Sequence, residues 1–450
     1  MTGGEGAGPR ILTPYPGPRT RALIERLRRV EGSAMRTSSG DVPLVAWESA
    51  SGALVWDPDG NRYLDLYAGF TAAAVGHAHP RVTAAIRAQA GRLTHVSSAY
   101  PTATRADLLE RLLSLAPPGL TRGLFAIAGG QANDLALRLA RRATGRDEVI
   151  AFRGGYLGRD AGVLGLAARS AVRRHLRVPP GAHFFPFPYP YRCAFGTRHA
   201  DPDECGREAL AFLDRALRDP ASGIGEVAAI VVEPVQGNAG VIIPPPSFLL
   251  GLRRLCDEFG ILLVFDEIQC GFGRTGRLWA AEHWGVVPDL MTVGKGIGGG
   301  LAVSAVLGRE APMRALDPGQ HTSTFLTNAL THAAALAALD VMTEEKLWEQ
   351  SAELGALLLS GLSARLGSHP HVGEVRGLGL FIAIEMVADR ETRESAPTLA
   401  AGVLQRGRDA GLILGLSGHD GNVVKLAPPL IISHEQIEVA IDLLASVLHR

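Results

Sequence analysis

An acid and a lysine, two residue types that can do chemistry, lie close together in the sequence near the middle of the chain. Asp266 comes directly after Ile261–Phe265, a run typical of a strand buried on both faces. Lys295 lies between two glycines, and three more glycines follow at 298–300. Glycines let a backbone approach a ligand closely, and open α/β sheets bind ligands at the carboxyl ends of their strands. The pattern therefore indicates one site with a buried acid and a buried lysine.

These two groups suit pyridoxal phosphate. A lysine can form an imine with the aldehyde of this cofactor, and an acid can hold the pyridine nitrogen in its protonated form. The chain has only three lysines, and Lys295 lacks the helical surroundings of an ordinary solvated lysine. Taken alone, the two residues are equally compatible with a structural role, in which Asp266 ends a strand and Lys295 lies on a glycine loop.

A second pattern indicates a phosphate site. Within residues 124–145, a short strand leads to Gly129 and Gly130 and then to a helix that stops before Gly145. Free backbone N–H groups and the positive end of the helix dipole favour an anion there. Glycine pairs also form plain turns, so this pattern supports a phosphate site only together with the pattern of Asp266 and Lys295.

The elements around these residues predict a parallel sheet. Strands are expected at Val149–Phe152, Glu226–Val232 and Ile261–Phe265, and a helix capped by Ser247 separates the last two, which is the order of a βαβ unit. The region 166–223 is expected to be rich in loops, 333–366 to be helical, and the C-terminal third to form an α+β unit.

Composition excludes several classes of function. Hydrophobic residues make up 46% and charged residues 20%, as in a globular enzyme, and a formal net charge of zero gives no reason to expect a nucleic-acid or anionic-membrane partner. No apolar stretch is long enough to span a bilayer. The four cysteines show no CxxC pairing, which predicts reduced thiols in a cytoplasmic protein. His199 between Cys193 and Cys205, and the pair His77 and His79, are weak metal patterns, and no metal is predicted.

Several motifs occur in one order along the chain: GHAHP, GGQAND, FRGGYLG, VVEPVQG, DEIQCGFGRTG, GKGIGGG, TSTF and LAPPL. From about Leu44 to the C-terminus the chain resembles the class III aminotransferases, which depend on pyridoxal phosphate. The resemblance implies the fold type I architecture of this class. This is an α/β fold whose large domain has a mostly parallel central sheet, with a smaller α+β domain built from N- and C-terminal segments. The expected division is an arm and part of the small domain at 1–75, the large cofactor-binding domain at 76–330 and the C-terminal small domain at 331–450.

The resemblance also implies roles for individual residues. Lys295 is similar to the Schiff-base lysine that shuttles the proton, and Asp266 to the acid beside the pyridinium. Thr324 resembles a threonine that reaches the phosphate in the neighbouring subunit, which implies a homodimer with active sites at the interface. The other expected cofactor contacts are the phosphate loop, the ring-stacking aromatic and the contact to the ring hydroxyl, namely Gly129, Gly130, Gln131, Tyr156 and Gln269.

Substrate-binding residues are less well defined by the resemblance. Glu233 and Lys425 fall at the positions of a Glu–Arg pair in relatives, whose arginine binds a substrate carboxylate and whose glutamate is its switchable partner. Tyr67 and Phe70 are expected to line the pocket. The chain departs from the family here, because a lysine is a point charge without the bidentate fork of arginine. The phosphate loop departs too, since Ala128 and Gly130 replace serines and Gln131 replaces a glutamate.

The expected function is therefore amino transfer by a ping-pong cycle, from an amino-acid donor such as glutamate or alanine to an aldehyde or ketone. An amino sugar or another secondary metabolite is one acceptor hypothesis. The alternative is a racemase or epimerase, or a decarboxylating relative, on the same scaffold. A non-catalytic member would be expected to lose Lys295 or Asp266, and both are present.

Overall fold

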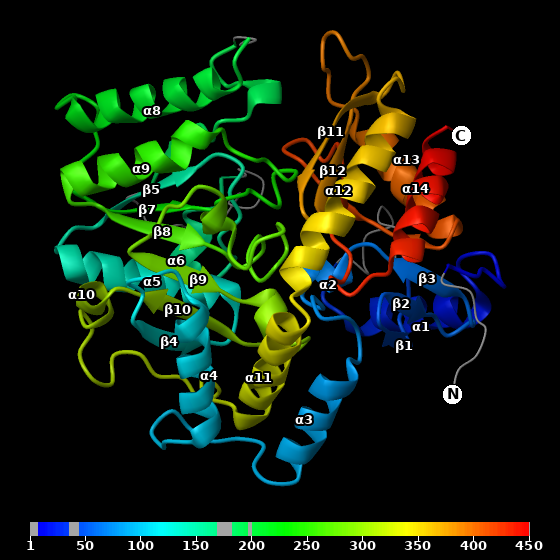
Figure 1. The fold of residues 1–450 in the computed structure, drawn as a ribbon, viewed down its shortest axis with the longest axis horizontal. Helices are drawn as coiled ribbons and strands as arrows, with labels where there is room; N and C mark the ends of the chain where they lie inside the picture. Colours follow the sequence, from blue (N-terminus) through cyan, green and yellow to red (C-terminus); the bar gives the residue numbers. More distant parts are fainter. Residues whose placement is uncertain (1–7, 36–44, 169–181, 197–199, 450) are drawn as a thin grey trace.

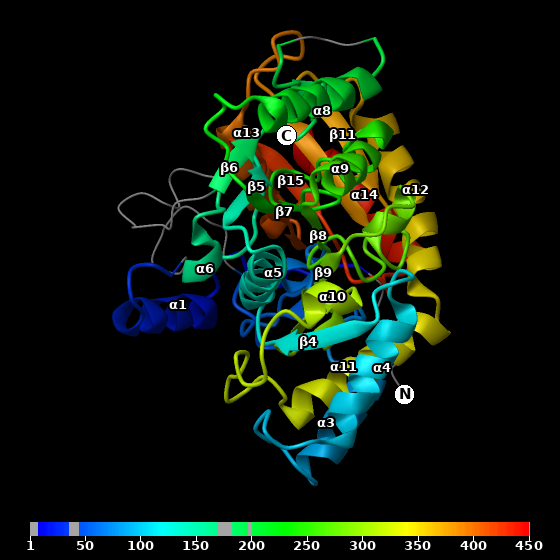
Figure 2. The ribbon, with the colours of Figure 1, turned by 90° about the vertical axis from the view of Figure 1, so that its left-hand side faces the viewer.

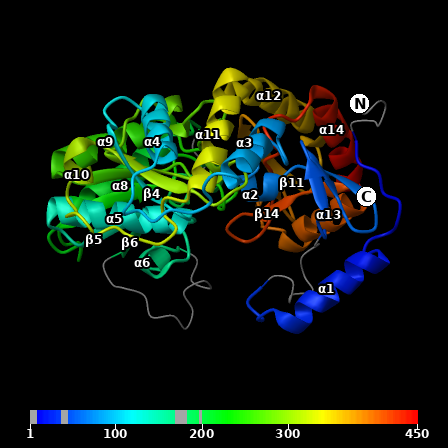
Figure 3. The same ribbon diagram turned by 90° about the horizontal axis from the view of Figure 1, so that it is seen from below.

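The computed structural model describes residues 8–35, 45–168, 182–196 and 200–449, and it consists of one large sheet and two smaller sheets with helices packed around them (Figure 1). The large sheet and its helices occupy one half of the molecule, and the C-terminal elements occupy the other half (Figure 3). No helix within the described ranges is long and apolar enough to cross a membrane.

The large sheet has seven strands. Each strand runs in the same direction except β10, which is antiparallel to both of its neighbours. The mostly parallel sheet expected from the sequence is thereby confirmed. In spatial order the strands are β4 (Arg122–Ala126), β10 (Ser304–Gly308), β9 (Leu290–Val293), β8 (Leu262–Asp266), β7 (Val227–Val232), β5 (Glu148–Phe152) and β6 (Ala182–Phe185).

Helices cover both faces of this sheet (Figure 2). Helix α5 (Gly129–Thr144) packs on one face, and α8 (Asp203–Arg218) and α9 (Pro246–Phe259) lie on the other. Alternate residues of β7 enter separate cores, because Val231 packs with the α5 side and Ile230 with the α9 side. This two-sided burial explains why the central strands are continuous apolar runs rather than alternating ones.

Two details of the α8–α9 face differ from the sequence-based expectations. The stretch 166–223 is not only loops, because α8 occupies 16 residues of it and buries Cys205, Ala209 and Leu213 along one side. These buried positions recur every fourth residue, which is the spacing of one helix face. Ser247 does not cap α9, since Pro245 holds that position and the Ser247 backbone N–H donates to Asp203 Oδ1 at 3.0 Å.

The C-terminal elements form an antiparallel sheet with three helices against it. The sheet order is β11 (Val372–Leu378), β12 (Phe381–Met386), β15 (Val423–Leu426) and β14 (Gly415–Ser417). The α+β unit expected in the C-terminal third is confirmed, and a capping box at Ser433 begins its last helix. The helices are α12 (Leu347–Leu366), α13 (Pro397–Asp409) and α14 (His434–Leu448).

The N-terminal segment joins the C-terminal half through a third sheet. Strand β13 (Leu412–Ile413) pairs in parallel with β3 (Arg62–Asp65), which continues a hairpin-like set with β2 (Leu54–Trp56) and β1 (Ser49–Ser51). The expectation that N- and C-terminal segments combine is confirmed. The first part of the chain is attached to the same sheet, because the backbone of Arg10 pairs with that of Arg62. Helix α1 (Pro18–Val30) follows.

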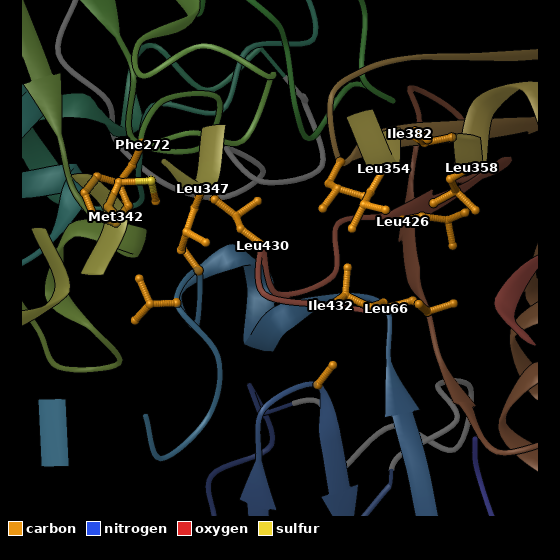
Figure 4. Packing of buried hydrophobic residues seen from close by; sticks show 14 of the residues in the cluster. Leu66, Phe272, Met342, Leu347, Leu354, Leu358, Ile382, Leu426, Leu430 and Ile432 are labelled. Atoms are coloured by element: carbon orange, nitrogen blue, oxygen red, sulfur yellow. The ribbon is translucent and has the colours of Figure 1, made fainter. Parts of the chain in front are cut away.

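The two halves share one core. Helix α11 (Ala329–Glu344) packs against α3 (Pro80–Ala90) and α4 (Ala103–Leu115), and the expected helical stretch 333–366 is in fact two helices, since Lys346 adopts φ 48° between α11 and α12. Phe272 and Met342 lie beside Leu347 and Leu430 in the continuous cluster (Figure 4). The domain boundaries stay a prediction.

The remaining elements are α2 (Ala68–Thr71), α6 (Ala161–Leu164), α10 (Glu310–Met313) and the 3₁₀ turns η2 (Pro190–Arg192), η3 (Ala280–His283) and η4 (Lys295–Gly298).

Candidate active site

The chemistry-bearing residues meet because the parallel strands end at the same edge of the large sheet. Asp266 is the last residue of β8, Glu233 follows the end of β7, and Lys295 lies two residues beyond the end of β9. Tyr156 follows β5 on a glycine-containing loop. Residues far apart in the sequence are thus brought to one place, as is usual for the ligand sites of open α/β sheets.

Lys295 is held in an unusual backbone conformation at this edge. It opens η4 with φ 45°, in the left-handed region that most side chains avoid. A Cβ atom on the next residue, Gly296, would lie 2.9 Å from Ala74 and Phe272, so only glycine fits there. Burial lowers the pKa of the Lys295 ammonium, while the nearby carboxylates of Asp266 and Glu233 oppose that shift. The amine of Lys295 is therefore more often in its neutral, nucleophilic form than the amine of a surface lysine.

Asp266 is buried, and both of its carboxylate oxygens accept hydrogen bonds. Oδ1 accepts from the backbone N–H of Ile268 at 2.9 Å, and Oδ2 accepts from Asn133 Nδ2 at 2.7 Å. Burial raises the pKa of Asp266, whereas these hydrogen bonds and the Lys295 charge favour its ionised form. Such a fixed carboxylate can hold a positive ring nitrogen.

Glu233 connects the ends of two strands. Its carboxylate accepts hydrogen bonds from the backbone N–H groups of Tyr156 at 2.8 Å and Gly237 at 3.0 Å. Burial, followed by repulsion from Asp266, raises the pKa of Glu233 to about 7. A carboxyl group with that pKa changes its protonation near neutral pH, and one of its two backbone partners, Tyr156, lines the cavity of the site.

A cavity of about 410 Å³ opens between these residues, which is large enough for a small cofactor and substrate. Four of the expected site residues that line it are Lys295, Gln269, Tyr156 and Lys425. The expected pocket residues Tyr67 and Phe70 also line it, with their ring centroids 4.8 Å apart. The aromatic side chains of Tyr67, Phe70 and Tyr156 and the side chain of Lys295 therefore line one cavity.

Lys425 projects into this cavity from β15 of the C-terminal sheet. Its Nζ donates to the carbonyl oxygen of Gly237 at 3.4 Å and lies 5.2 Å from the ring centroid of Tyr67 and 5.9 Å from that of Phe381. Aromatic faces and a carbonyl stabilise an ammonium without neutralising it. Lys425 is therefore placed to receive an anionic group of a substrate.

The glycine pair lies behind the cavity at the start of α5. A Cβ atom on the cavity-lining Gly158 would lie 2.5 Å from the Cα atom of Gly130, so two backbones pack directly together. The first backbone N–H groups of the 16-residue helix α5 accordingly face this region. The expected site residues that do not line the cavity are Gly129, Gly130, Gln131, Glu233, Asp266 and Thr324. Gln131 is exposed and accepts from the Ile127 backbone N–H at 3.3 Å, and Thr324 is exposed.

Three residues of the site were missed by reasoning from the sequence. Asn133 lies within the GGQAND motif, and Arg159 follows the FRGGYLG motif and lines the cavity. Thr292 is a buried polar residue inside the apolar strand β9. A lone polar residue in an apolar strand was the available signal for Thr292.

Comparisons with known proteins agree with this geometry. The model of the family "Aminotransferase class-III" matches residues 35–448. The chain belongs to the class III aminotransferases. The acetylornithine aminotransferase of Methanothermobacter thermautotrophicus is 38% identical over 90% of this aminotransferase and 94% of the relative. The alanine/serine racemase of Pyrococcus horikoshii is 33% identical, covering 97% and 92% of the two chains.

A solved structure extends the comparison to the fold. The (S)-enantioselective omega-transaminase of Thermomicrobium roseum superposes on this aminotransferase with a TM-score of 0.86 at 30% identity, covering 95% of this chain and 98% of the other. The fold type I architecture expected from the sequence is confirmed. Like its family, this aminotransferase uses pyridoxal phosphate. The residues present fit that cofactor, because a cavity lined by Tyr156 and by a lysine with a lowered pKa adjoins a buried carboxylate and the N-terminus of α5.

Proposed function

We propose that this aminotransferase takes the amino group of an amino-acid donor whose carboxylate is bound by Lys425, and passes it to an aldehyde or ketone. The main support for this proposal is that the ammonium of Lys425 lies in the same cavity as Lys295. Arg159 adds a second cation on the cavity wall, which favours a donor or acceptor with a further anionic group. Glutamate and alanine are the donors expected from the sequence.

The roles of the chain's own residues follow from their chemistry. When bound, pyridoxal phosphate supplies the carbonyl that accepts the amino group and the conjugated ring that takes up the electrons of the broken Cα–H bond. Lys295 then serves as the base that removes the proton from the substrate Cα, because its lowered pKa leaves a larger neutral fraction. Asp266 holds the ring nitrogen, and the aromatic wall at Tyr156 orients the ring.

Racemisation is the second candidate, because one relative is an alanine/serine racemase. A two-base racemase needs a second titratable group on the side of the substrate opposite Lys295. Asn238, which occupies the position after the EPVQG motif, lines the cavity, and an amide does not exchange protons near neutral pH. This observation supports transfer over racemisation.

Assembly into a homodimer is part of the proposal. Thr324 is exposed, and the neighbouring Phe325 exposes 58% of its surface with its ring 5.1 Å from that of His95. An exposed aromatic beside a residue expected to reach another subunit's phosphate supports an interface at this segment. The amino-sugar acceptor stays a prediction from the sequence.

The test is a single-turnover assay of the cofactor-loaded enzyme with glutamate, alanine and an amine of similar size that lacks a carboxylate. Without an acceptor, the proposal requires one equivalent of keto acid per site, and continued turnover only when an aldehyde or ketone is added. The same reaction in deuterated water separates the two candidates. Inversion with deuterium at Cα that does not depend on any keto acid would establish racemisation instead.

A further inference from the structure

A chain of three buried polar side chains ends at the carboxylate of Asp266. Thr292 Oγ1 donates to Asn133 Oδ1 at 2.8 Å, and Asn133 Nδ2 donates to Asp266 Oδ2 at 2.7 Å. The same amide nitrogen donates to the carbonyl oxygen of Leu157 at 2.9 Å. All three side chains are buried, so bulk water cannot replace any of these hydrogen bonds.

The fold brings the three residues together from separate elements. Asp266 and Thr292 are register partners on the adjacent parallel strands β8 and β9. Asn133 lies in the second turn of α5, which packs on both strands. Leu157 belongs to the loop that carries Tyr156, so the amide of Asn133 links the carboxylate to the cavity wall.

The direction of the hydrogen bonds follows from the chemistry of the partners. A carboxylate and a carbonyl oxygen are acceptors only, so the Asn133 NH₂ group must face Asp266 and Leu157. The Asn133 oxygen then needs a donor, and the Thr292 hydroxyl is placed to supply it. With the amide turned over, an oxygen would face two acceptor oxygens in a buried place, which is strongly unfavourable.

We infer that Asn133 is a positioning residue that holds the Asp266 carboxylate in one orientation and in its ionised form toward the cofactor ring nitrogen, and that Thr292 fixes the orientation of the Asn133 amide. A hydrogen bond from Asn133 favours the charged carboxylate, as do the Ile268 backbone N–H, the Lys295 charge and the Thr292 hydroxyl. The Asp266 charge in turn raises the pKa of the nearby Glu233. The inference rests on the proposed role of Asp266, and it adds the two residues, Asn133 and Thr292, that keep the carboxylate in place.

Two nearly isosteric variants test the inference. Asn133→Asp replaces the donor with a second carboxyl group, and Thr292→Val removes the hydroxyl while keeping the branched shape; Thr292→Ser, which keeps the donor, is the matched control. The readout is the dissociation constant of pyridoxal phosphate from each enzyme, with the pH titration of the bound cofactor's visible absorbance. Loss of a hydrogen bond to a charged group predicts about 10- to 100-fold weaker binding for Asn133→Asp. Thr292→Val should weaken binding about tenfold and Thr292→Ser about twofold.

A cofactor analogue that has carbon in place of the ring nitrogen separates positioning from a merely structural role. If Asn133 acts through Asp266 on that nitrogen, the variants should bind the analogue as well as the unchanged enzyme does. Equal losses with both cofactors, or no loss with either, would overturn the inference. If Asn133→Asp does not fold, the Thr292→Val and Thr292→Ser pair decides on the same criterion. Asp266→Asn tests the underlying role separately, since activity within tenfold of the unchanged enzyme would contradict it whatever the Asn133 variants show.

Discussion

Glu233 accepts a hydrogen bond from the backbone N–H of Tyr156 at 2.8 Å, which ties the end of β7 to the loop that follows β5. This bond favours the ionised carboxylate, but burial and then repulsion from Asp266 outweigh it and raise the pKa of Glu233 to about 7. Folding therefore disfavours the ionised carboxylate. The stability that this group contributes is fully present below its ordinary pKa and is lost as the pH rises toward 7.

Glu233→Gln should reduce this pH dependence. Between about pH 4.5 and 7 the unchanged protein should lose on the order of 3 kcal/mol of unfolding free energy through Glu233. The amide cannot ionise, so the variant should show a flatter profile over that window. Glu267, whose pKa burial also raises to about 7, contributes in the same direction in both proteins and so cancels. Denaturant unfolding across the window measures the difference, and parallel profiles would contradict the shift.

Lys295→Ala should abolish turnover and leave the fold intact, because it removes the amine proposed as the base and shortens one side chain on the wall of the cavity. Lys346→Ala is a suitable control, since Lys346 lies on the surface at the start of α12. Borohydride reduction of the cofactor-loaded enzyme, followed by peptide mapping, should place the label on Lys295. A label on Lys346 or Lys425 would show that the whole site is assigned incorrectly.

Lys425→Met should raise KM for amino-acid donors about 10- to 100-fold, since it keeps the length of the side chain and removes the charge proposed to bind their carboxylate. An amine donor without a carboxylate should be much less affected. Lys425→Arg is the matched variant that retains the charge. Steady-state kinetics with both kinds of donor measure the ratio, and equal losses for both donors would remove Lys425 from carboxylate binding.

Asp160→Asn should strengthen the binding of pyridoxal phosphate about three- to tenfold at low salt. A Cβ atom on Gly130 would lie 1.8 Å from Asp160 Oδ2, so this carboxylate adjoins the glycine pair where the phosphate is expected. Removing a like charge favours an anion there, and added salt should reduce the gain. Asp257→Asn, an exposed acid on α9, is the control. Unchanged affinity in Asp160→Asn would show that the phosphate binds elsewhere.

Thr324→Ala should weaken cofactor binding without altering the stability of the separated chain, because Thr324 is exposed and is proposed to serve the other subunit's phosphate. Sedimentation paired with activity assays over a dilution series checks the assembly. Activity should fall as the dimer dissociates. A fully active monomer would exclude a shared site.

Much of this site could be predicted from local sequence. The apolar run before Asp266, the glycines around Lys295 and the glycine pair that begins α5 each reflect a constraint within a few residues, namely burial of a strand on both faces or a backbone conformation that side chains exclude. These local constraints do not depend on which segments pack together. The order of the motifs then identified the family.

Only the tertiary structure decided how distant residues meet. Asn133 and Thr292 are 159 residues apart in the chain, and their hydrogen bond exists because α5 packs over β9. Lys425 lies near Tyr67 because the C-terminal strands pack against the segment after β3, where the backbone N–H of Ala427 donates to the carbonyl oxygen of Leu66. Local patterns specify elements, whereas the pairing of buried polar groups depends on strand register and helix packing, which involve the whole chain. The sequence by itself therefore determined the cofactor chemistry, and the packing of the sheets decided which side chains orient it.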